Sequence, residues 1–419
     1  MHCGSRLSEG QRELLGPVAV LDSIHGAGII ASRLRELGID AESLEVYHNT
    51  HNVERFSLVI APVHLPPQNS TLSYARRLGK RIISHHRAVG MILGERDFRA
   101  VEITGTRGKT TTALLLALIL SHDMRVISHT TSGIELWSRG RRSLIRSGLS
   151  ITPGNLIAAH QIASEERADF LISEVSLGGT GAFDVGVITD LAGDYLIAGG
   201  TMWASTAKLQ MLSLSDLDAR IVANTDAKLS SDITFGHSGD VRIRGRSVEV
   251  REKSLPLSLG EALDIPAYSD GIAGALAAAI SIGVDAQNAV DALDGFEGFQ
   301  GRMARYQLDG VNVIDNSNSG LKVSGIERAL DLASGGRICL VAGEDAESVC
   351  EGLDIDALVR MIESRRDEID ELVLVGRRLE PYAPRLGGCT ARNFQEGLEV
   401  ARRYTSAGDH LVLCVKCFR

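Results

Sequence analysis

The chain has few aromatic residues and no long apolar run. Aromatic residues make up 4% of its 419 residues. The apolar stretch Ala113–Leu120 is much shorter than the roughly 18 residues that a membrane span needs, so we expect no transmembrane helix. The N-terminal segment MHCGSRLSEGQRELL is polar and has no apolar core of a secretory signal. We therefore expect a cytoplasmic protein without a membrane partner.

Cysteine is also scarce, and its six positions are scattered. Such spacing in a long chain excludes a disulfide framework and favours reduced, mostly buried thiols. One pair forms a CxxC near the C-terminus, which without a second pair is weak evidence for a metal or redox site. We interpret it as part of a buried or frayed terminal strand. The six residues are Cys3, Cys339, Cys350, Cys389, Cys414 and Cys417.

An excess of positive charge is lacking as well. The chain has 44 Lys and Arg against 53 Asp and Glu, a net charge of −9, which argues against nucleic acid as a partner. What the sequence does contain is 44% hydrophobic residues and 44 glycines, a composition that suits an α/β fold with short βα turns. The length predicts two or three domains.

The stretch VEITGTRGKTTTALLLALIL is the most informative part of the chain. It predicts a strand at Val101–Ile103, a glycine turn, and a helix that follows Lys109. Free N–H groups of the first helical turn and the helix dipole would together bind phosphate, to which Lys109 adds a charge. The hydroxyl of Thr110 is placed to ligate Mg²⁺. The other predicted nucleotide-binding residues of this loop are Thr104, Gly105, Thr106, Arg107, Gly108 and Thr111.

The loop departs from the general pattern GxxxxGK[ST], because the first glycine would fall on Ile103. The form TGTRGKTTT resembles the nucleotide loop of the Mur ligase superfamily. An ordinary glycine turn before a helix is the alternative. The resemblance implies ATP and Mg²⁺ as cofactors and a three-domain α/β architecture. We expect an N-terminal Rossmann-like substrate domain over residues 1–97, a central P-loop ATPase domain over 98–298, and a C-terminal Rossmann-like domain over 299–419.

The first hundred residues predict a Rossmann-like βαβ unit. Apolar runs and glycine turns indicate three strands and one helix. The strands are Val18–Leu21, Glu45–Tyr47 and Leu58–Ala61, and the helix is Ile29–Leu37.

Histidines follow several predicted strand ends in this region. Ligands of such sheets gather at the carboxyl ends of the strands. We therefore predict that His25, Gly26, His64 and His85 bind a polar or anionic substrate. Each histidine by itself is better explained by a structural or exposed role than by a functional one, and it is their equivalent places that favour binding. The segment HGAG is too short for a dinucleotide fingerprint.

Two further residues are predicted to hold metal in the central domain. The apolar strand Asp169–Ser173 delivers Glu174 at its carboxyl end, a position that suits a second Mg²⁺ ligand, although a surface Glu is the alternative. Lys208, in STAKLQML, matches the Mur ligase lysine that CO₂ converts to a carbamate. The resemblance implies that this anion bridges to Mg²⁺. The alternative is a solvated helix lysine.

The resemblance also implies nucleotide contacts farther along the chain. In other positions of this region the chain departs from the family. Asn224 stands at the end of a strand that matches the family. Arg302, in a border GR pair, would meet the γ-phosphate, and Asp315 would help to hold the nucleotide. Asp190 replaces the usual Asn, and Asp194–Tyr195 replaces an Asp-His pair that the family uses for amino-acid acceptors.

Together these parts predict an ATP-dependent ligase that converts a substrate carboxylate to an acyl phosphate. The segments LDSIHGAGIIASRLRELG, VYHNT, APVHL and SEVSLGGTG are similar to a branch of archaeal Mur-like enzymes from methanogens. That similarity implies a nickel tetrapyrrole acid as the small-molecule substrate and closure of its last carbocyclic ring. Two alternatives stay open: an amide ligase that adds an amino acid, and a nucleotide-binding protein without catalysis.

Overall fold

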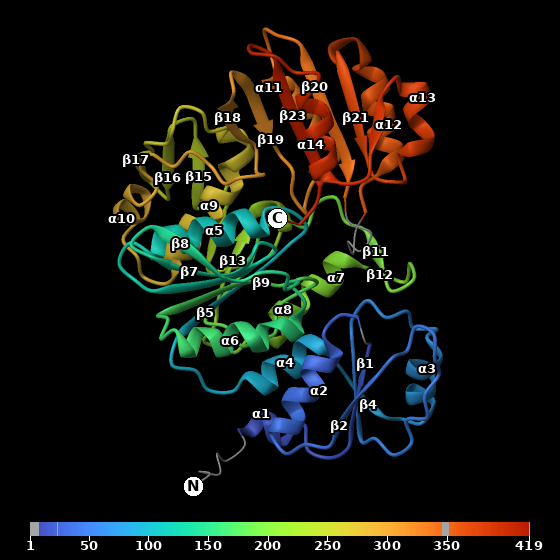
Figure 1. Cartoon of the computed structure of the whole chain (residues 1–419). Coiled ribbons are helices and arrows are strands. Elements are labelled where there is room, and N and C mark those ends of the chain that lie inside the picture. Colours follow the sequence, from blue (N-terminus) through green and yellow to red (C-terminus); the bar gives the residue numbers. More distant parts are fainter. Residues whose placement is uncertain (1–7, 23, 346–351, 419) are drawn as a thin grey trace. The chain divides into compact units, whose positions relative to one another are not determined.

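The computed structural model describes residues 8–22, 24–345 and 352–418 (Figure 1). The chain packs as two compact units. One unit combines the residues up to 257 with residues 269–293, and the other combines 258–268 with the residues from 294 onward. Three main sheets lie within residues 18–84, 99–256 and 304–416, in line with the Mur-type three-domain α/β architecture. The predicted domain boundaries at 97/98 and 298/299 stay predictions.

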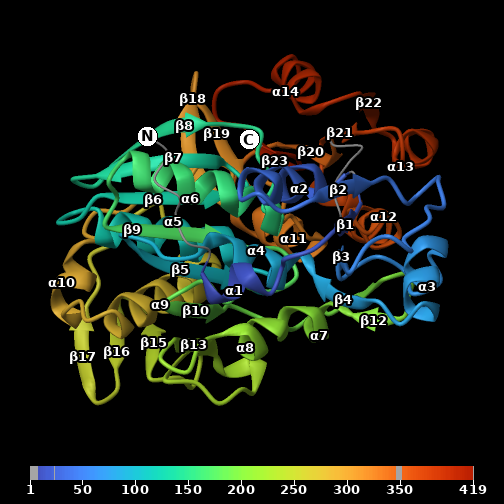
Figure 2. The same cartoon turned by 90° about the horizontal axis from the view of Figure 1, so that it is seen from below.

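The N-terminal sheet is parallel, with the strand order β2-β1-β3-β4. Alternating strand residues divide its core between two faces, so that α2 and α4 cover one face and α3 covers the other. Figure 2 shows α2 and α4 side by side. The strands are β1 (Val18–Leu21), β2 (Ala41–Leu44), β3 (Leu58–Ala61) and β4 (Arg81–Ser84); the helices are α1 (Glu9–Arg12), α2 (Ala27–Glu36), α3 (Ser70–Arg77) and α4 (His85–Leu93).

The prediction of a strand at Glu45–Tyr47 is wrong. The strand β2 ends at Leu44, and the Glu45 carboxylate accepts hydrogen bonds from the main-chain N–H of Tyr47 (2.7 Å) and His48 (3.2 Å). This side chain captures the N–H groups that a continuing strand would pair, so it closes a turn.

The central sheet has eleven strands, of which seven neighbours run parallel and include the P-loop strand β5. These are β15, β14, β13, β10, β5, β9 and β6. The order is β17-β16-β15-β14-β13-β10-β5-β9-β6-β7-β8. The strands are β5 (Arg99–Thr104), β6 (Val126–Thr130), β7 (Gly133–Ser138), β8 (Arg141–Arg146), β9 (Phe170–Glu174), β10 (Val185–Ile188), β13 (Arg220–Asn224), β14 (Ile233–Phe235), β15 (Val241–Arg244), β16 (Ser247–Val250) and β17 (Lys253–Pro256).

Helices and one short hairpin complete this part of the chain. Helix α5 is apolar nearly all round, which matches its burial against β6 and β9. The elements are α5 (Lys109–Leu120), η1 (Pro153–Asn155), α6 (Leu156–Glu165), the hairpin β11 (Leu196–Ile197) and β12 (Met202–Trp203), α7 (Ala204–Lys208), α8 (Gln210–Leu214), η2 (Thr225–Ala227), α9 (Ile265–Ser281) and α10 (Ala286–Asp291).

The second unit contains a six-stranded sheet, β18-β19-β23-β20-β21-β22, that is parallel except for the β18–β19 pair. Three of its strands, β20, β21 and β23, are almost entirely buried. The elements are β18 (Ala304–Leu308), β19 (Val311–Asp315), α11 (Val323–Leu332), β20 (Ile338–Glu344), α12 (Ile355–Ser364), η3 (Arg366–Glu368), β21 (Glu371–Val375), η4 (Glu380–Tyr382), α13 (Ala383–Leu386), β22 (Cys389–Ala391), α14 (Phe394–Arg402) and β23 (His410–Lys416).

The cysteine and membrane expectations agree with the described residues. None of Cys339, Cys389, Cys414 and Cys417 is in a disulfide, and the CxxC pair is buried at the end of β23 and just beyond it. Cys3 and Cys350 lie outside the described residues. Within the described ranges, every helix is too short or too polar to cross a bilayer.

Candidate active site

The loop between β5 and α5 has the conformation that its glycines predict. Gly105 (φ +147°) and Gly108 (φ +79°) occupy backbone regions that disfavour side chains. A Cβ on Gly105 would stand 2.2 Å from the Thr189 hydroxyl, so the loop also needs glycine for its close approach to the neighbouring chain. Gly108 is the N-cap of α5, whose first N–H groups face the loop.

Residues that follow the adjacent strand β10 hold this loop in place. The Thr106 N–H donates to the main-chain oxygen of Asp190 (2.6 Å), and the Thr189 hydroxyl contacts the main-chain oxygens of Thr104 (3.2 Å) and Arg107. The Asp190 carboxylate lies 3.6 Å from the Arg107 guanidinium. The replacement of the family Asn by Asp190 thus accompanies an ion pair with an arginine of the loop itself.

The two predicted oxygen ligands for Mg²⁺ lie together. The Thr110 hydroxyl donates to Glu174 Oε2 (2.7 Å), and Lys109 Nζ lies 3.8 Å from Glu174 Oε1 and donates to the Gly105 carbonyl (3.1 Å). Glu174 is 2% exposed, which contradicts the alternative of a surface residue. A hydroxyl and a buried carboxylate at the N-terminus of a helix are the oxygen donors that Mg²⁺ prefers, so these residues fit the ion.

Lys208 is the last residue of α7 and is 2% exposed, so the alternative of a solvated lysine is wrong. Its Nζ lies 4.8 Å from the ring centroid of Tyr195. Partial burial raises the pKa of Asp194, but hydrogen bonds from Ser205 and Tyr195 and the charge of Lys208 outweigh it and hold that pKa below its usual value. Both residues of the Asp194–Tyr195 pair that replaces the family Asp-His therefore lie near Lys208.

The remaining nucleotide residues of the first unit have structural contacts of their own. Asn224 is buried at the end of β13, and its side-chain oxygen accepts the Asp226 N–H (2.9 Å). Thr111 packs closely against Gly271 of α9. A Cβ added to Gly271 would lie only 2.8 Å from the methyl group of Thr111. These contacts fix both residues, and their nucleotide roles stay predictions.

Arg302 and Asp315 belong to the second unit. The Tyr268 hydroxyl donates to the Arg302 carbonyl and accepts the Phe299 N–H, both at 2.7 Å, so the main chain at Arg302 is fixed. Desolvation raises the pKa of Tyr268 to about 12, so this phenol keeps its proton. Asp315 is fully buried at the end of β19 and accepts the Ser317 N–H (3.0 Å).

Two of the four predicted substrate residues meet at the carboxyl edge of the N-terminal sheet. His64 Nε2 lies 3.2 Å from His25 Nδ1, which lies 2.7 Å from a carboxylate oxygen of Asp22. Desolvation and the charge of His25 lower the pKa of His64 to about 4, against an opposing effect of Asp22. Sequence reasoning missed Asp22, whose only signal was an acid directly after the strand β1.

The other two predicted substrate residues have contacts that favour structural roles. His85 is buried, its Nε2 lies 2.9 Å from the Leu21 carbonyl, and desolvation lowers its pKa to about 3. Gly26 is the N-cap of α2 with φ +98°, and a Cβ there would stand 3.3 Å from the Cα of Gly154. Their predicted contact with substrate stays a prediction.

A buried acid on β5 was also missed. Glu102 accepts hydrogen bonds from the Thr180 N–H (2.6 Å) and hydroxyl (2.5 Å), and a Cβ on Gly179 would crowd it at 2.9 Å. Desolvation raises its pKa to about 7, against the opposing hydrogen bonds from Thr180. The glycines of SLGGTG therefore let the backbone reach this carboxyl group.

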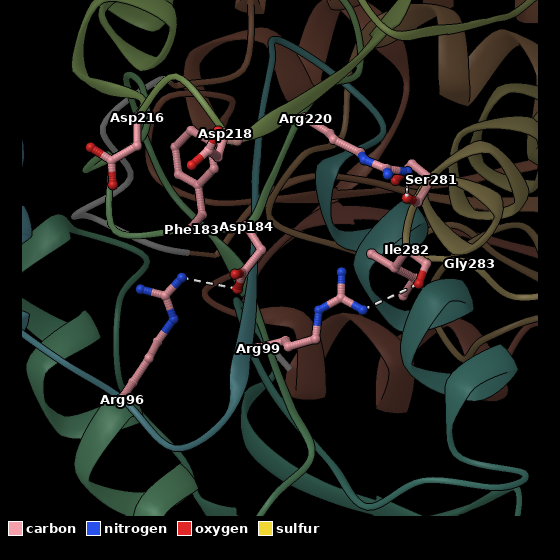
Figure 3. Close-up of a pocket in the computed structure, with 11 residues that line it drawn as sticks. Arg96, Arg99, Phe183, Asp184, Asp216, Asp218, Arg220, Ser281, Ile282 and Gly283 are labelled. Atoms are coloured by element: carbon pink, nitrogen blue, oxygen red, sulfur yellow. Dashed lines mark hydrogen bonds and ion pairs between the residues drawn. The ribbon is translucent and has the colours of Figure 1, made fainter.

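A cavity of about 480 Å³ lies at the opposite, amino ends of β5, β10 and β13 (Figure 3). Its arginines already have partners: Arg96 binds Asp184 (2.9 Å), Arg99 donates to the Ile282 carbonyl (3.2 Å), and Arg220 donates to a neighbouring carbonyl. Because the cavity lies at the amino ends of these strands, it is separate from their carboxyl ends, where the P-loop and the predicted ATP-binding residues lie.

Two family models match the chain. The Mur ligase middle domain matches residues 103–254, and the C-terminal domain of coenzyme F430 synthetase CfbE matches residues 305–417. Coenzyme F(430) synthetase of Methanosarcina acetivorans is 35% identical over 468 positions, which cover 96% of this chain and 98% of that protein.

Solved structures show the same fold. MurC from Thermotoga maritima, a UDP-N-acetylmuramate-alanine ligase, aligns with a TM-score of 0.53 and 16% identity over 96% of this chain and 95% of its own. A pseudomurein peptide ligase type C from Methanothermus fervidus aligns with a TM-score of 0.53 and 16% identity over 96% of this chain and 97% of its own.

Proposed function

Because this chain belongs to the coenzyme F(430) synthetase family of Mur-type, ATP-dependent ligases, we propose that it closes the last carbocyclic ring of a nickel tetrapyrrole acid. The observation that carries the ATP chemistry is the contact between Thr110 and Glu174 beside Lys109, at the N-terminus of α5. The cytoplasmic location expected from the sequence is part of this proposal.

The reaction begins with transfer of a phosphoryl group. An oxygen of the substrate carboxylate attacks the γ-phosphorus of ATP, the bond to ADP breaks, and an acyl phosphate forms. Lys109 and the loop N–H groups bind the phosphates, and Thr110 and Glu174 would hold Mg²⁺. When bound, the ion supplies positive charge that offsets the charge of the transferred group. Arg302 is assigned to the γ-phosphate, and Asp315 to the nucleotide.

Ring closure consumes the acyl phosphate. A ring carbon gives up its proton to water and attacks the acyl carbon, a carbon–carbon bond forms, and the bond between the acyl carbon and the phosphate oxygen breaks, so that phosphate leaves. The nucleophile is part of the same molecule, so no amino-acid acceptor is needed. The replacement of the Asp-His pair by Asp194–Tyr195 supports this choice. Lys208, buried beside these residues, is proposed to carry a carbamate that adds an anionic metal ligand.

An exposed apolar pair supports a substrate with a large ring system. Leu196 and Trp203 are direct cross-strand partners in the β11–β12 hairpin and are 51% and 52% exposed. At the tip of the same hairpin, a Cβ on Gly199 would stand 3.3 Å from Pro66 of the APVHLPP loop. The pair thus lies near the histidine edge of the N-terminal sheet, and a flat macrocycle could stack on the indole.

Release of ADP with defined substrates tests the proposal. The purified chain is mixed with Mg-ATP and either the ring-opened nickel tetrapyrrole acid or carboxylate and amino-acid pairs. We expect ADP and phosphate in equal amounts to closed ring, with no added amino acid. ADP release only with an amino acid would identify an amide ligase instead, and ATP binding without release would identify a non-catalytic protein.

A further inference from the structure

Three potential metal ligands converge at the carboxyl edge of the N-terminal sheet. Asp22 follows β1, His25 lies before α2, and His64 follows β3, the parallel neighbour of β1. One ligand atom of each lies within 4.8 Å of the others. The separations are 2.7 Å between Asp22 and His25, 3.2 Å between the histidines, and 3.9 Å between Asp22 and His64.

These separations suit one metal ion. Bonds of about 2.0–2.2 Å from an ion to nitrogen and oxygen place neighbouring donor atoms roughly 3–3.5 Å apart in octahedral or tetrahedral geometry. Of the three observed separations, 2.7 Å lies below that range, 3.2 Å within it and 3.9 Å above it. Shifts of a few tenths of an ångström would therefore bring all three donors to a common ion.

A bound cation would contact all three of these side chains at once, which a single hydrogen between them does not do. His25 Nδ1 faces both the Asp22 carboxylate and His64 Nε2, so the single hydrogen on that nitrogen points directly at only one of them. The Tyr47 hydroxyl, 3.4 Å from His64 Nε2, offers a second and longer contact there. A cation accepts a lone pair from each donor at once.

The carboxylate is oriented toward the histidines by the backbone. Asp22 is fully buried with φ +93°, a conformation that costs energy for a residue with a side chain. One of its carboxylate oxygens accepts the Ile24 N–H (2.7 Å), and the other faces His25. The side chains of His25 and His64 are 22% and 26% exposed, so an ion has an entry path from solvent.

The donor set selects the class of ion. Two imidazoles and one carboxylate suit Zn²⁺, Ni²⁺, Co²⁺ or Fe²⁺, whereas Mg²⁺ prefers oxygen ligands alone. The nickel of a tetrapyrrole is held by four ring nitrogens and offers one axial position on each face, so it cannot take three protein ligands from one side. We propose that Asp22, His25 and His64 bind one macrocycle-free divalent transition-metal ion, separate from the Mg²⁺ of ATP.

Cobalt binding to the full-length, untagged, chelator-treated chain tests this site. The probe is Co²⁺ in a buffer with excess Mg²⁺ and no tetrapyrrole, so the outcome does not depend on the proposed reaction. Equilibrium dialysis with elemental analysis gives the stoichiometry, and the visible absorbance of Co²⁺ reports nitrogen ligands. We expect one equivalent of Co²⁺ and a visible band.

Variants assign the binding to these residues. We expect His25→Ala, His64→Ala and Asp22→Asn each to weaken Co²⁺ binding by at least about tenfold. Asp22→Asn keeps the oxygen that accepts the Ile24 N–H, so it preserves the turn if an alanine variant misfolds. His122→Ala, at an exposed position in the central domain, should bind like the unchanged chain. The proposal would be overturned if the unchanged chain did not bind one equivalent of Co²⁺, or if all three variants bound Co²⁺ with unchanged affinity.

Discussion

The Thr110 hydroxyl donates a 2.7 Å hydrogen bond to the buried carboxylate of Glu174. The two residues come from different elements, the first turn of α5 and the end of β9, which pairs with the P-loop strand β5. Their contact places a hydroxyl and a carboxylate beside Lys109, where Mg²⁺ and the phosphates of ATP are expected to meet.

Glu174→Gln should reduce ATP turnover by roughly 100-fold or more, because it removes a negative charge at the proposed metal site while keeping the shape of the side chain. Turnover measured over a range of Mg²⁺ concentrations should show a raised requirement for the ion. Glu165→Gln changes an exposed acid on α6 and serves as the control. Equal Mg²⁺ dependence in both variants would remove Glu174 from the metal site.

Thr189→Val should weaken ATP binding more than Asp190→Asn does. The Thr189 hydroxyl contacts two main-chain oxygens of the loop, and each lost hydrogen bond costs about 1 kcal/mol. Together they correspond to about 2 kcal/mol, or roughly a thirtyfold higher KM for ATP. Asp190→Asn keeps the main-chain bond to Thr106 and loses a pair with Arg107, which is 49% exposed, so its effect should stay within about fivefold. The opposite order of KM values would contradict this account of the loop.

Lys208→Ala should abolish most turnover but leave ATP binding intact, if a carbamate on Lys208 supplies a metal ligand. A short carboxylate such as acetate should then restore part of the lost activity, since it can enter the space left by the lysine side chain and serve as the anionic metal ligand in place of the carbamate. Lys253→Ala, at an exposed strand position, should retain normal turnover without acetate. Full activity of Lys208→Ala, or a loss that no carboxylate restores, would argue against the carbamate.

Glu102→Gln should change the pH dependence of stability. Burial raises the pKa of Glu102 from 4.5 to about 7, so the folded state holds a proton that the unfolded state releases between these values. The contribution of Glu102 to the free energy of unfolding is therefore highest below pH 4.5, where Glu102 is protonated in both states, and it falls as the pH rises to 7, where the folded state loses this proton. The variant mimics the protonated acid, so its advantage should grow over this window by on the order of 3 kcal/mol. Denaturant unfolding at pH 5 and pH 8 measures the difference, and a constant gap would contradict it.

Trp203→Ala should raise the KM for the tetrapyrrole acid by roughly tenfold or more and leave the KM for ATP unchanged. The exposed indole is expected to lose a stacking contact worth about 1–3 kcal/mol, as base stacking on aromatic side chains is. Trp203→Phe should restore most of the affinity, because it keeps an aromatic face. An unchanged KM for the acid in the alanine variant would exclude this hairpin from the substrate site.

Local patterns predicted the parts of the site that depend on neighbouring residues. A strand, two glycines, a lysine and a threonine determine the P-loop, and the apolar strand before Glu174 correctly predicted that this residue lies at a strand end, while its metal role stays a prediction. The error at Glu45–Tyr47 has a local cause too, because a side chain took the N–H groups that a strand would have paired.

Contacts between distant segments were not predictable in the same way. Nothing in the sequence around Asp22 shows that its carboxylate faces His64, because that contact depends on the pairing of β1 with β3. The burial of Lys208 likewise depends on how its short helix packs, since five residues are too few for a periodic pattern to reveal a buried face. The hydrogen bonds to Glu102 likewise come from Thr180, in a loop that follows another strand.

The transfer of labelled oxygen tests the central claim most directly. The tetrapyrrole acid is prepared with ¹⁸O in the carboxylate that is to be activated and is mixed with the enzyme and Mg-ATP. Our account predicts that each phosphate released carries one ¹⁸O atom from that carboxylate, together with one ADP and one closed ring. Ring closure with phosphate that contains no ¹⁸O would contradict an acyl phosphate intermediate.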